Sequence, residues 1–185
     1  MSKILVTGGF GFIGSYITEE LLRNNYEVIV ADISVNHAIV GAKYIKCDIL
    51  SHEDLSKVFK EDFDTIIHLA GFSNLRESIN NPSLTLSLNT LSTTRILELA
   101  VEKGIKKFIY GSSAYANSNK GSFYGISKLA SEKIVEEFSQ KFHLHYLILR
   151  YGSVYSEKES HNNYMYNLIS KALKEESINH HSDGL

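Results

Sequence analysis

Tyr124 and Lys128 are the two residues whose types and spacing most directly suggest catalysis. On a helix, residues four apart lie on one face, so the phenol and the ammonium would be neighbours. A free tyrosine has a pKa of about 10, and a positive charge beside it favours the phenolate, which can act as a base. Ser113 ends an apolar run upstream, and its hydroxyl could orient a substrate oxygen. Alone, this spacing is more typical of an exposed helical face, so its interpretation as a proton-transfer site depends on the rest of the chain.

The glycine-rich stretch from Thr7 to Gly14 is typical of a turn that binds phosphate groups. It follows the apolar run 4–6 and leads into the amphipathic stretch 15–22, which gives the order strand, turn, helix. Gly8 permits the tight turn, Gly11 lets the backbone approach a pyrophosphate, and Gly14 lets helix and strand pack closely. Amide groups and the positive dipole end at the helix start would face the phosphates. The pattern predicts a dinucleotide site.

Asp32 suggests which dinucleotide is bound. It follows a second apolar run, 28–31, and lies about 20 residues beyond the glycines, as the dinucleotide fingerprint requires. Its carboxylate would accept hydrogen bonds from the hydroxyls of the adenine ribose, and its charge would repel a 2′-phosphate. The next residues, 33–35, offer no arginine to neutralise that phosphate. We therefore expect NAD and not NADP.

Strand and helix patterns alternate along the chain. Short apolar runs predict strands at 3–7, 27–32, 43–47, 65–70, 107–110 and 145–150. Periodic apolar residues predict helices at 12–24, 51–60, 83–102, 122–142 and 163–175. Ser51, with Asp54 three residues on, is a plausible cap for the second helix. The alternation predicts an α/β fold, a Rossmann-type doubly wound parallel sheet with helices on both faces.

Composition limits the classes of partner. The 185 residues suit one domain, and the net charge of -2 gives no electrostatic reason to expect nucleic acid or an anionic membrane. No stretch approaches 18 uninterrupted apolar residues, and the start of the chain lacks a signal-peptide pattern. Cys47 is the single cysteine, so we expect a reducing cytoplasm, with the thiol filling space in the core.

Other polar residues are interpreted as structural. His68 lies in an apolar strand and is expected to be a satisfied core histidine and not a base. His180 and His181 lack partners at zinc-site spacing, so no metal site is predicted. The acids of the pairs Glu132–Lys133 and Glu136–Glu137 are expected to form the solvated face of a helix.

Taken together, the motifs resemble those of the extended short-chain dehydrogenase/reductases, in the NAD-dependent epimerase/dehydratase group that acts on nucleotide sugars. The resemblance extends over essentially the whole chain. Besides the residues above, it rests on the segments Cys47–Ile49, His68–Gly71, Asn89 with Thr93, Phe108–Ser113 and Leu149–Tyr151. It implies that Ser113, Tyr124 and Lys128 are catalytic. The implied cofactor contacts are Gly8, Gly11, Phe12, Ile13, Gly14, Asp32, Ile33, Asp48, Ile49, Leu69, Ala70, Gly71, Asn89, Ser112, Tyr124, Lys128 and Tyr151.

The activity implied by the resemblance is that of a nucleotide-sugar epimerase. NAD would take a hydride from a sugar carbon while Tyr124 removes the hydroxyl proton. Ser113 would hold the oxygen, and Lys128 would anchor the nicotinamide ribose and lower the pKa of Tyr124. Two alternatives stay open, a nucleotide-sugar 4-keto reductase and a non-catalytic NAD-binding regulatory or scaffold protein. The 4,6-dehydratase branch is disfavoured, because it places acids where this chain has Ala114 and Tyr115.

Departures from the family pattern concern the substrate region. Ser153 stands where the family usually has asparagine, Ser156 and Glu157 replace Gly-Pro, and the stretch between Ser113 and Tyr124 is short. The resemblance implies an NAD-binding domain over 1–155 and the start of a truncated substrate-binding region over 156–185, with the C-terminal substrate domain largely absent.

The resemblance also implies a homodimer. Helices 83–102 and 122–142 would pair with their copies in a second subunit. We expect this pairing to cover the apolar residues Leu86, Leu97, Ile134 and Phe138.

Overall fold

A computed structural model describes residues 2–34, 39–156 and 164–175. The chain divides into two compact units, Met1–Arg150 and Tyr151–Leu185, and each is described by itself. Most of the segment 156–185, including His180 and His181, lies outside the described residues. The assignment of cofactor binding to 1–155 and substrate binding to 156–185 therefore stays a prediction.

The first unit is built on a sheet of six strands in the order β3-β2-β1-β4-β5-β6. Pairing is parallel between β1 and β2, β1 and β4, β2 and β3, and β4 and β5. The strand order reverses between β1 and β4, and ligands of such sheets bind at the carboxyl ends of the strands beside that reversal. The strands are β1 (Lys3–Thr7), β2 (Glu27–Asp32), β3 (Lys43–Lys46), β4 (Thr65–His68), β5 (Lys107–Ser113) and β6 (His145–Tyr151).

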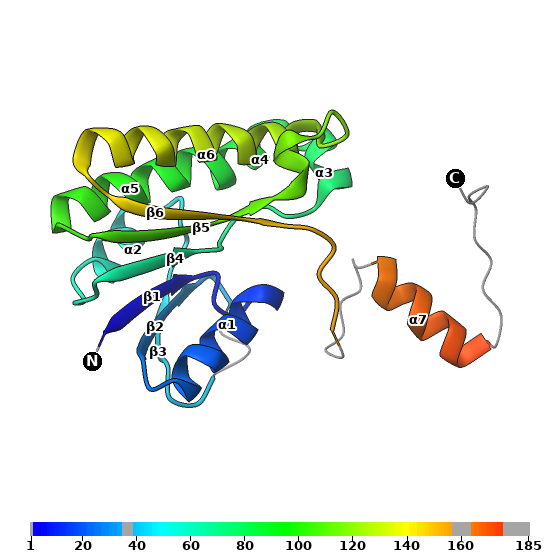
Figure 1. Ribbon diagram of the computed structural model, residues 1–185, viewed down its shortest axis with the longest axis horizontal. Coiled ribbons are helices and arrows are strands. Elements are labelled where there is room, and N and C mark those ends of the chain that lie inside the picture. Colours follow the sequence, from blue (N-terminus) through cyan, green and yellow to red (C-terminus); the bar gives the residue numbers. More distant parts are fainter. Residues whose placement is uncertain (1, 35–38, 157–163, 176–185) are drawn as a thin grey trace. The chain divides into compact units, whose positions relative to one another are not determined.

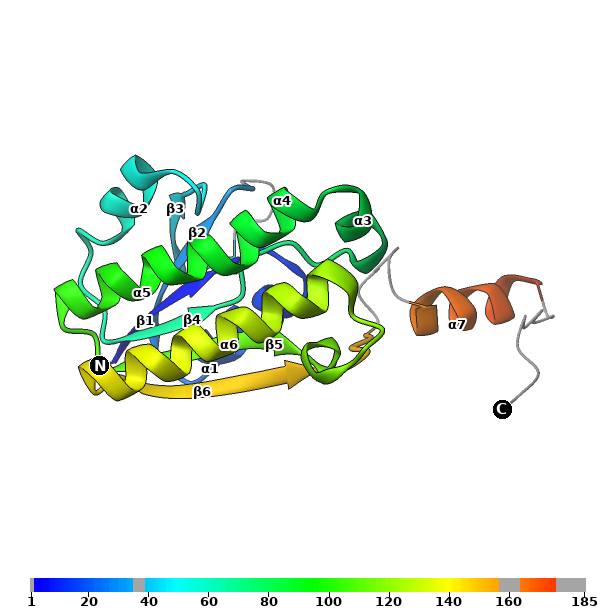
Figure 2. The same cartoon turned by 90° about the horizontal axis from the view of Figure 1, so that it is seen from above.

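Helices cover both faces of the sheet, as predicted (Figure 1). On one face α1 (Phe12–Arg23) packs Ile17 and Leu21 against Val6 and Val30. On the other face α2 (His52–Val58), α5 (Ser92–Lys103) and α6 (Ser122–Phe142) enclose a larger core. Figure 2 shows α5 and α6 running side by side over this second face. The predicted doubly wound α/β fold is confirmed. Across the ranges that the structure describes, every helix is too short or too polar to cross a membrane.

The predicted helix 83–102 is interrupted. It consists of α4 (Pro82–Leu86), a π-helical turn η1 (Ser87–Leu91) and α5. A π-turn lengthens the backbone ring, and serine and threonine hydroxyls bond to the carbonyls around it. The hydroxyls of Ser92, Thr93 and Thr94 each donate to the carbonyl four residues earlier. Apolar periodicity carries no information on such bonds, which is why the interruption was not predicted.

Three further elements complete the described structure. The short helix α3 (Leu75–Asn80) and the 3-10 turn η2 (Ala114–Asn117) were not predicted from the sequence. Both are too short to show a clear apolar period. In the second unit, α7 (Tyr164–Glu175) confirms the predicted helix from residue 164 onward, whereas residue 163 lies outside the described residues.

Candidate active site

The glycine turn between β1 and α1 leaves no room for a side chain at Gly8 or Gly14. Gly8 has φ +71, and a Cβ there would lie 2.7 Å from the amide nitrogen of Ala70. A Cβ on Gly14 would lie 2.0 Å from the carbonyl oxygen of Gly8, so strand end and helix start touch through backbone atoms. The N-cap residue of α1 is Gly11, which has no side chain to bond to the amides of the first helical turn. A cradle of backbone amides at a helix N-terminus suits a pyrophosphate.

Asp32 braces this turn at the carboxyl end of β2. Its Oδ2 accepts a hydrogen bond from the Phe10 amide at 3.0 Å, and its Oδ1 accepts from the Ser34 amide at 2.9 Å. The following residue, Ile33, exposes 65% of its surface. The carboxylate therefore lies beside the glycine turn, in the place where a bound dinucleotide would present its adenine ribose. Each carboxylate oxygen has further acceptor capacity for ribose hydroxyls.

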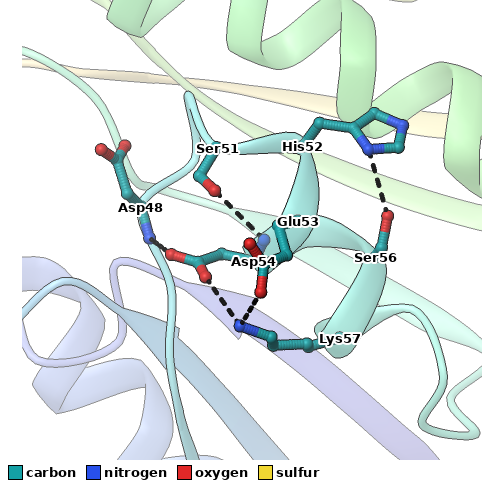
Figure 3. A network of polar contacts seen from close by, with 7 residues as sticks. All are labelled: Asp48, Ser51, His52, Glu53, Asp54, Ser56 and Lys57. Carbon is teal, nitrogen blue, oxygen red and sulfur yellow. Dashed lines mark hydrogen bonds and ion pairs between the residues drawn. The ribbon is translucent and has the colours of Figure 1, made fainter.

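The segment of Asp48 and Ile49 is fixed by the first turn of α2 (Figure 3). The Asp54 carboxylate accepts from the Asp48 amide at 3.1 Å, and the Asp48 carboxylate accepts from the amide of Leu50 at 2.8 Å. Ser51 accepts from the Asp54 amide, which confirms the predicted cap. Ile49 is buried in the core, and the neighbouring Cys47 is buried too, with burial raising the pKa of its thiol to about 12.

His68 is a satisfied core histidine, as predicted. Its Nδ1 lies 2.6 Å from the Thr7 hydroxyl, and its Nε2 lies 3.0 Å from the Thr93 hydroxyl. Thr93 gives its own proton to the carbonyl of Asn89, so it must accept from Nε2–H, and Nδ1 then accepts from Thr7. Burial, reinforced by the charge of Lys128, lowers the pKa of His68 to about 3. The ring is neutral and joins the glycine turn to the π-turn.

Asn89 holds the chain that follows β4. Its Oδ1 accepts from the Phe72 amide at 2.7 Å, and its Nδ2 donates to the Phe72 carbonyl at 3.1 Å and to the Ser127 hydroxyl at 2.8 Å. A Cβ on Gly71 would lie 2.5 Å from that Oδ1, so glycine is needed for the close approach. The amide group of Asn89 is thus occupied by protein partners. Leu69 and Ala70, between β4 and Gly71, are partly buried against the two cores.

The structure brings Ser113, Tyr124 and Lys128 to one edge of the sheet. Ser113 ends β5, and its Oγ accepts from the Tyr115 amide at 3.2 Å. Tyr124 and Lys128 lie on the first turns of α6. The Lys128 ammonium donates to the Gly111 carbonyl at 2.8 Å and lies 5.0 Å from the centre of the Tyr110 ring.

Burial dominates the protonation of this site. It lowers the pKa of Lys128 to about 8, against the opposing effect of the Glu132 carboxylate. It also raises the pKa of Tyr124, although the nearby Ser113 hydroxyl acts in the opposite direction. The expectation that Lys128 lowers the pKa of Tyr124 is wrong for this structure. The reason is that desolvation outweighs the remaining effects on the phenol, while the ammonium is engaged by Gly111.

Glu132 is a site residue that sequence reasoning missed. The predicted solvated face is wrong at this position, because Glu132 exposes only 1% of its surface. Its carboxylate accepts from Arg150 Nε at 2.9 Å and Nη2 at 2.6 Å, and from the hydroxyl of Ser112. That hydroxyl, expected near the cofactor, therefore points to α6. The position of Glu132 four residues after Lys128, on the same helical face, was the available signal.

The remaining predicted contacts occupy the expected elements. Phe12 and Ile13 begin α1 and are half-buried. Tyr151 ends β6 and belongs to the second unit, and burial raises the pKa of its phenol. Its contact with a cofactor therefore stays a prediction, as do the direct contacts of the other residues.

We expect His68→Gln to lower the free energy of unfolding at pH 7.5 by about 1–3 kcal/mol, because buried hydroxyls lose a partner. Below about pH 6.5 the unfolded chain protonates His68, whereas the folded chain holds it neutral down to about 3. The free energy of unfolding of the natural chain therefore decreases as the pH falls, and its difference from that of His68→Gln becomes smaller. Urea unfolding at pH 7.5 and 4.5 measures this. The matched control His52→Gln, at an exposed histidine of α2, should leave the pH dependence unchanged. An equal gap for His68→Gln at both pH values contradicts the assignment.

The sequence of the chain is similar to those of known proteins. The sequence model of the family described as NAD dependent epimerase/dehydratase matches residues 4–185. A putative UDP-glucose 4-epimerase of Methanocaldococcus jannaschii is 33% identical over 174 residues, which are 84% of this chain and 57% of that protein. The UDP-glucose 4-epimerase of Streptococcus mutans is 31% identical over 175 residues, with 84% and 53% covered. The chain thus spans a little over half the length of these two curated relatives.

Solved structures agree with the fold. The UDP-glucose 4-epimerase of Thermotoga maritima, crystallised with UDP-glucose, superposes with a TM-score of 0.85 at 28% identity, covering 92% of this chain and 63% of that one. The Thermus thermophilus UDP-glucose 4-epimerase, in complex with NAD, gives a TM-score of 0.82 at 28% identity, with 92% and 61% covered.

Proposed function

The chain belongs to the NAD-dependent epimerase/dehydratase family, and from this premise we propose that it acts as an NAD-dependent epimerase of nucleotide sugars. The observation that carries the proposal is the placement of Ser113, Tyr124 and Lys128 at the carboxyl edge of the sheet that also bears the glycine cradle. The UDP-glucose bound to the Thermotoga maritima relative supports a uridine diphosphate sugar as substrate class.

The residues present fit NAD. The cradle around Gly8, Gly11 and Gly14 would take the pyrophosphate, Asp32 the hydroxyls of the adenine ribose, and Lys128 the nicotinamide ribose. The chemistry supplied by bound NAD is reversible hydride transfer. The direct contacts of the chain with NAD, including those predicted for Asp48 and Tyr151, are part of the proposal.

Tyr124 would carry the proton of the reaction. Burial keeps its phenol protonated at neutral pH, so it is ready to donate to a ketone oxygen. Removing the hydroxyl proton of the sugar requires the phenolate, and therefore requires positive charge close to the ring. Ser113, whose hydroxyl acts on the pKa of the phenol, would orient the same sugar oxygen. In an epimerase the proton that Tyr124 takes up would return to the sugar, and the sugar would be neither oxidised nor reduced overall because the hydride that bound NAD takes up would return to it as well.

We expect Tyr124→Phe to lower turnover by ~10²–10⁴-fold with little change in NAD affinity, because it removes the hydroxyl that takes the substrate proton. Ser113→Ala should cost less, since it removes one hydrogen bond. Lys128→Met should weaken both turnover and NAD binding. Initial rates with UDP-sugars, measured together with NAD titrations, test this order.

The matched control is Tyr115→Phe, whose ring stands edge-on to Tyr124 at 6.4 Å and which should keep the natural rate. Conversion of a 4-keto sugar to the reduced sugar with consumption of an equal amount of NADH would favour the 4-keto reductase. A chain that binds NAD but turns over no nucleotide sugar, and whose NAD binding is unaffected by Tyr124→Phe, would favour the hypothesis of a regulatory or scaffold protein.

NAD should bind more tightly than NADP. The Asp32 carboxylate would accept hydrogen bonds from the 2′- and 3′-hydroxyls of the adenine ribose and would repel a 2′-phosphate. Calorimetric titration with both dinucleotides measures the difference, and Asp32→Asn should reduce it. The control Asp62→Asn changes an acid whose side chain is 98% exposed and should leave the preference unchanged. Tighter binding of NADP to the natural chain overturns the prediction.

A homodimer is also part of the proposal, with a corrected set of contact residues. Leu97 was expected at the interface, but it is buried in the core because it faces the sheet, and Ile134 and Phe138 pack partly against the same core. Leu86 stays exposed at 39%. The helices α4, η1 and α6 contact one another and carry further exposed apolar side chains, those of Leu84, Leu91, Ile126 and Leu129.

A second copy of the chain would cover these side chains by isologous pairing. We expect a dimeric mass in light scattering at micromolar concentration, and a monomeric mass for the double variant Ile126→Glu, Leu129→Glu. The control Val40→Glu, at a valine that is 96% exposed outside these helices, should remain dimeric. A monomeric natural chain would refute the dimer without affecting the proposed reaction.

A further inference from the structure

Glu132 joins three elements that lead to the site. Its carboxylate lies on α6, one helical turn after Lys128, and receives hydrogen bonds from Ser112 on β5 and from Arg150 on β6. Both carboxylate oxygens are occupied, in a fork-shaped pairing with the guanidinium. Ser112 directly precedes Ser113. Through these bonds Glu132 fixes the end of β5 against the helix that carries Tyr124 and Lys128.

The carboxylate is ionised in spite of its burial. Burial would raise the pKa of Glu132, but the hydrogen bonds and charge of Arg150, together with the hydrogen bond from Ser112, hold the pKa below its usual value. The negative charge therefore persists at neutral pH, and about 42% of the Arg150 side chain remains in contact with solvent. A buried charge that is fully hydrogen-bonded can be retained where an unpaired one could not.

Lys128 is a second buried charge, and its surroundings are mostly neutral. It is faced by the Gly111 carbonyl and the Tyr110 ring from β5, by the neutral His68 from β4, and by Glu132 on its own helix. Arg150 on β6 acts through Glu132, and Tyr124 lies one turn earlier on α6. Among these groups Glu132 is the one that carries a negative charge, so it is the group that favours the ammonium against desolvation.

We propose that Glu132 is a positioning residue of the site, which keeps Lys128 charged and holds Ser113 in place, with Arg150 adjusting the strength of its charge. The proposal deepens the proposed function, because a charged Lys128 matters there for binding the nicotinamide ribose. Its electrostatic part concerns the chain alone and can be measured without a cofactor.

The test is the titration of Lys128 by NMR of the full chain labelled with 13C at the lysine Cε, with Lys128→Met used to assign the signal. Glu132→Gln keeps the shape and the hydrogen-bond acceptor but removes the charge, so the pKa of Lys128 should fall below its natural value of about 8. Arg150→Gln removes the opposing positive charge, so the pKa of Lys128 should rise. Arg150→Lys keeps the charge and should restore a pKa near the natural value.

A merely structural clamp predicts a different result. Glu132→Gln and Arg150→Gln would then both lower the free energy of unfolding, and the pKa of Lys128 would not move in opposite directions. Equal or parallel shifts in the two variants would overturn the proposal. Should Glu132→Gln fail to fold, the comparison of Arg150→Gln with Arg150→Lys decides alone, and an unchanged pKa in Arg150→Gln rejects the proposal. The control Glu136→Gln removes a carboxylate of the same helix that pairs with Lys133 at the surface, and it should leave Lys128 unchanged.

A second experiment, the titration of the chain with NAD, separates this inference from the proposed function. NAD titrations across pH 6–10 should show binding that weakens as Lys128 loses its proton, with a midpoint that shifts to lower pH in Glu132→Gln. Opposite NMR shifts in a chain that does not bind NAD would refute the proposed function and leave the role of Glu132 in the charge of Lys128 intact. NAD binding whose pH dependence is identical in Glu132→Gln and in the natural chain would refute the inference and leave the proposed function intact.

Discussion

A buried hydrogen-bond network centred on Asn89 sets the geometry on which the site depends. The side-chain amide of Asn89 joins the segment after β4 to α6. The backbone carbonyl of Asn89 accepts hydrogen bonds from the hydroxyls of Thr93 and Ser131. Thr93 continues the network through His68 to Thr7, at the edge of the glycine turn. The glycine turn and α6 are thereby fixed to each other through buried side chains. In a low dielectric such satisfied networks are rigid, and unpaired members would be costly.

Desolvation is the second physical theme of the molecule. The same burial that orders the network lowers the pKa of Lys128 and raises the pKa of Tyr124. The Glu132 carboxylate opposes the effect of desolvation on Lys128, and it is itself held ionised by Arg150. The Glu132 carboxylate thus links the charge of Lys128 to the packing of the edge strand β6 against α6.

Several features could be predicted from the sequence because they follow from local rules. Alternating apolar periods indicated the order of strands and helices, and the glycine spacing indicated a turn in which Gly8 and Gly14 have no room for a side chain. The Ser51 cap follows from the types of two residues three positions apart. The π-helical turn at Ser87–Leu91 was missed, because apolar spacing does not distinguish a single π-turn from a regular helical turn.

The class of fold, the glycine turn and the position of Tyr124 and Lys128 on one helical face follow from residues that lie close together in the chain. Which side chains are buried, and which of them are charged, depends on contacts between distant segments. Glu132 was expected in solvent because its neighbours are polar, yet Arg150 and Ser112, from strands distant in sequence or across the sheet, enclose it. Leu97 was expected at a surface and faces the sheet. Burial is a property of the assembled fold, and the pKa of a buried group depends on partners that the local sequence does not name.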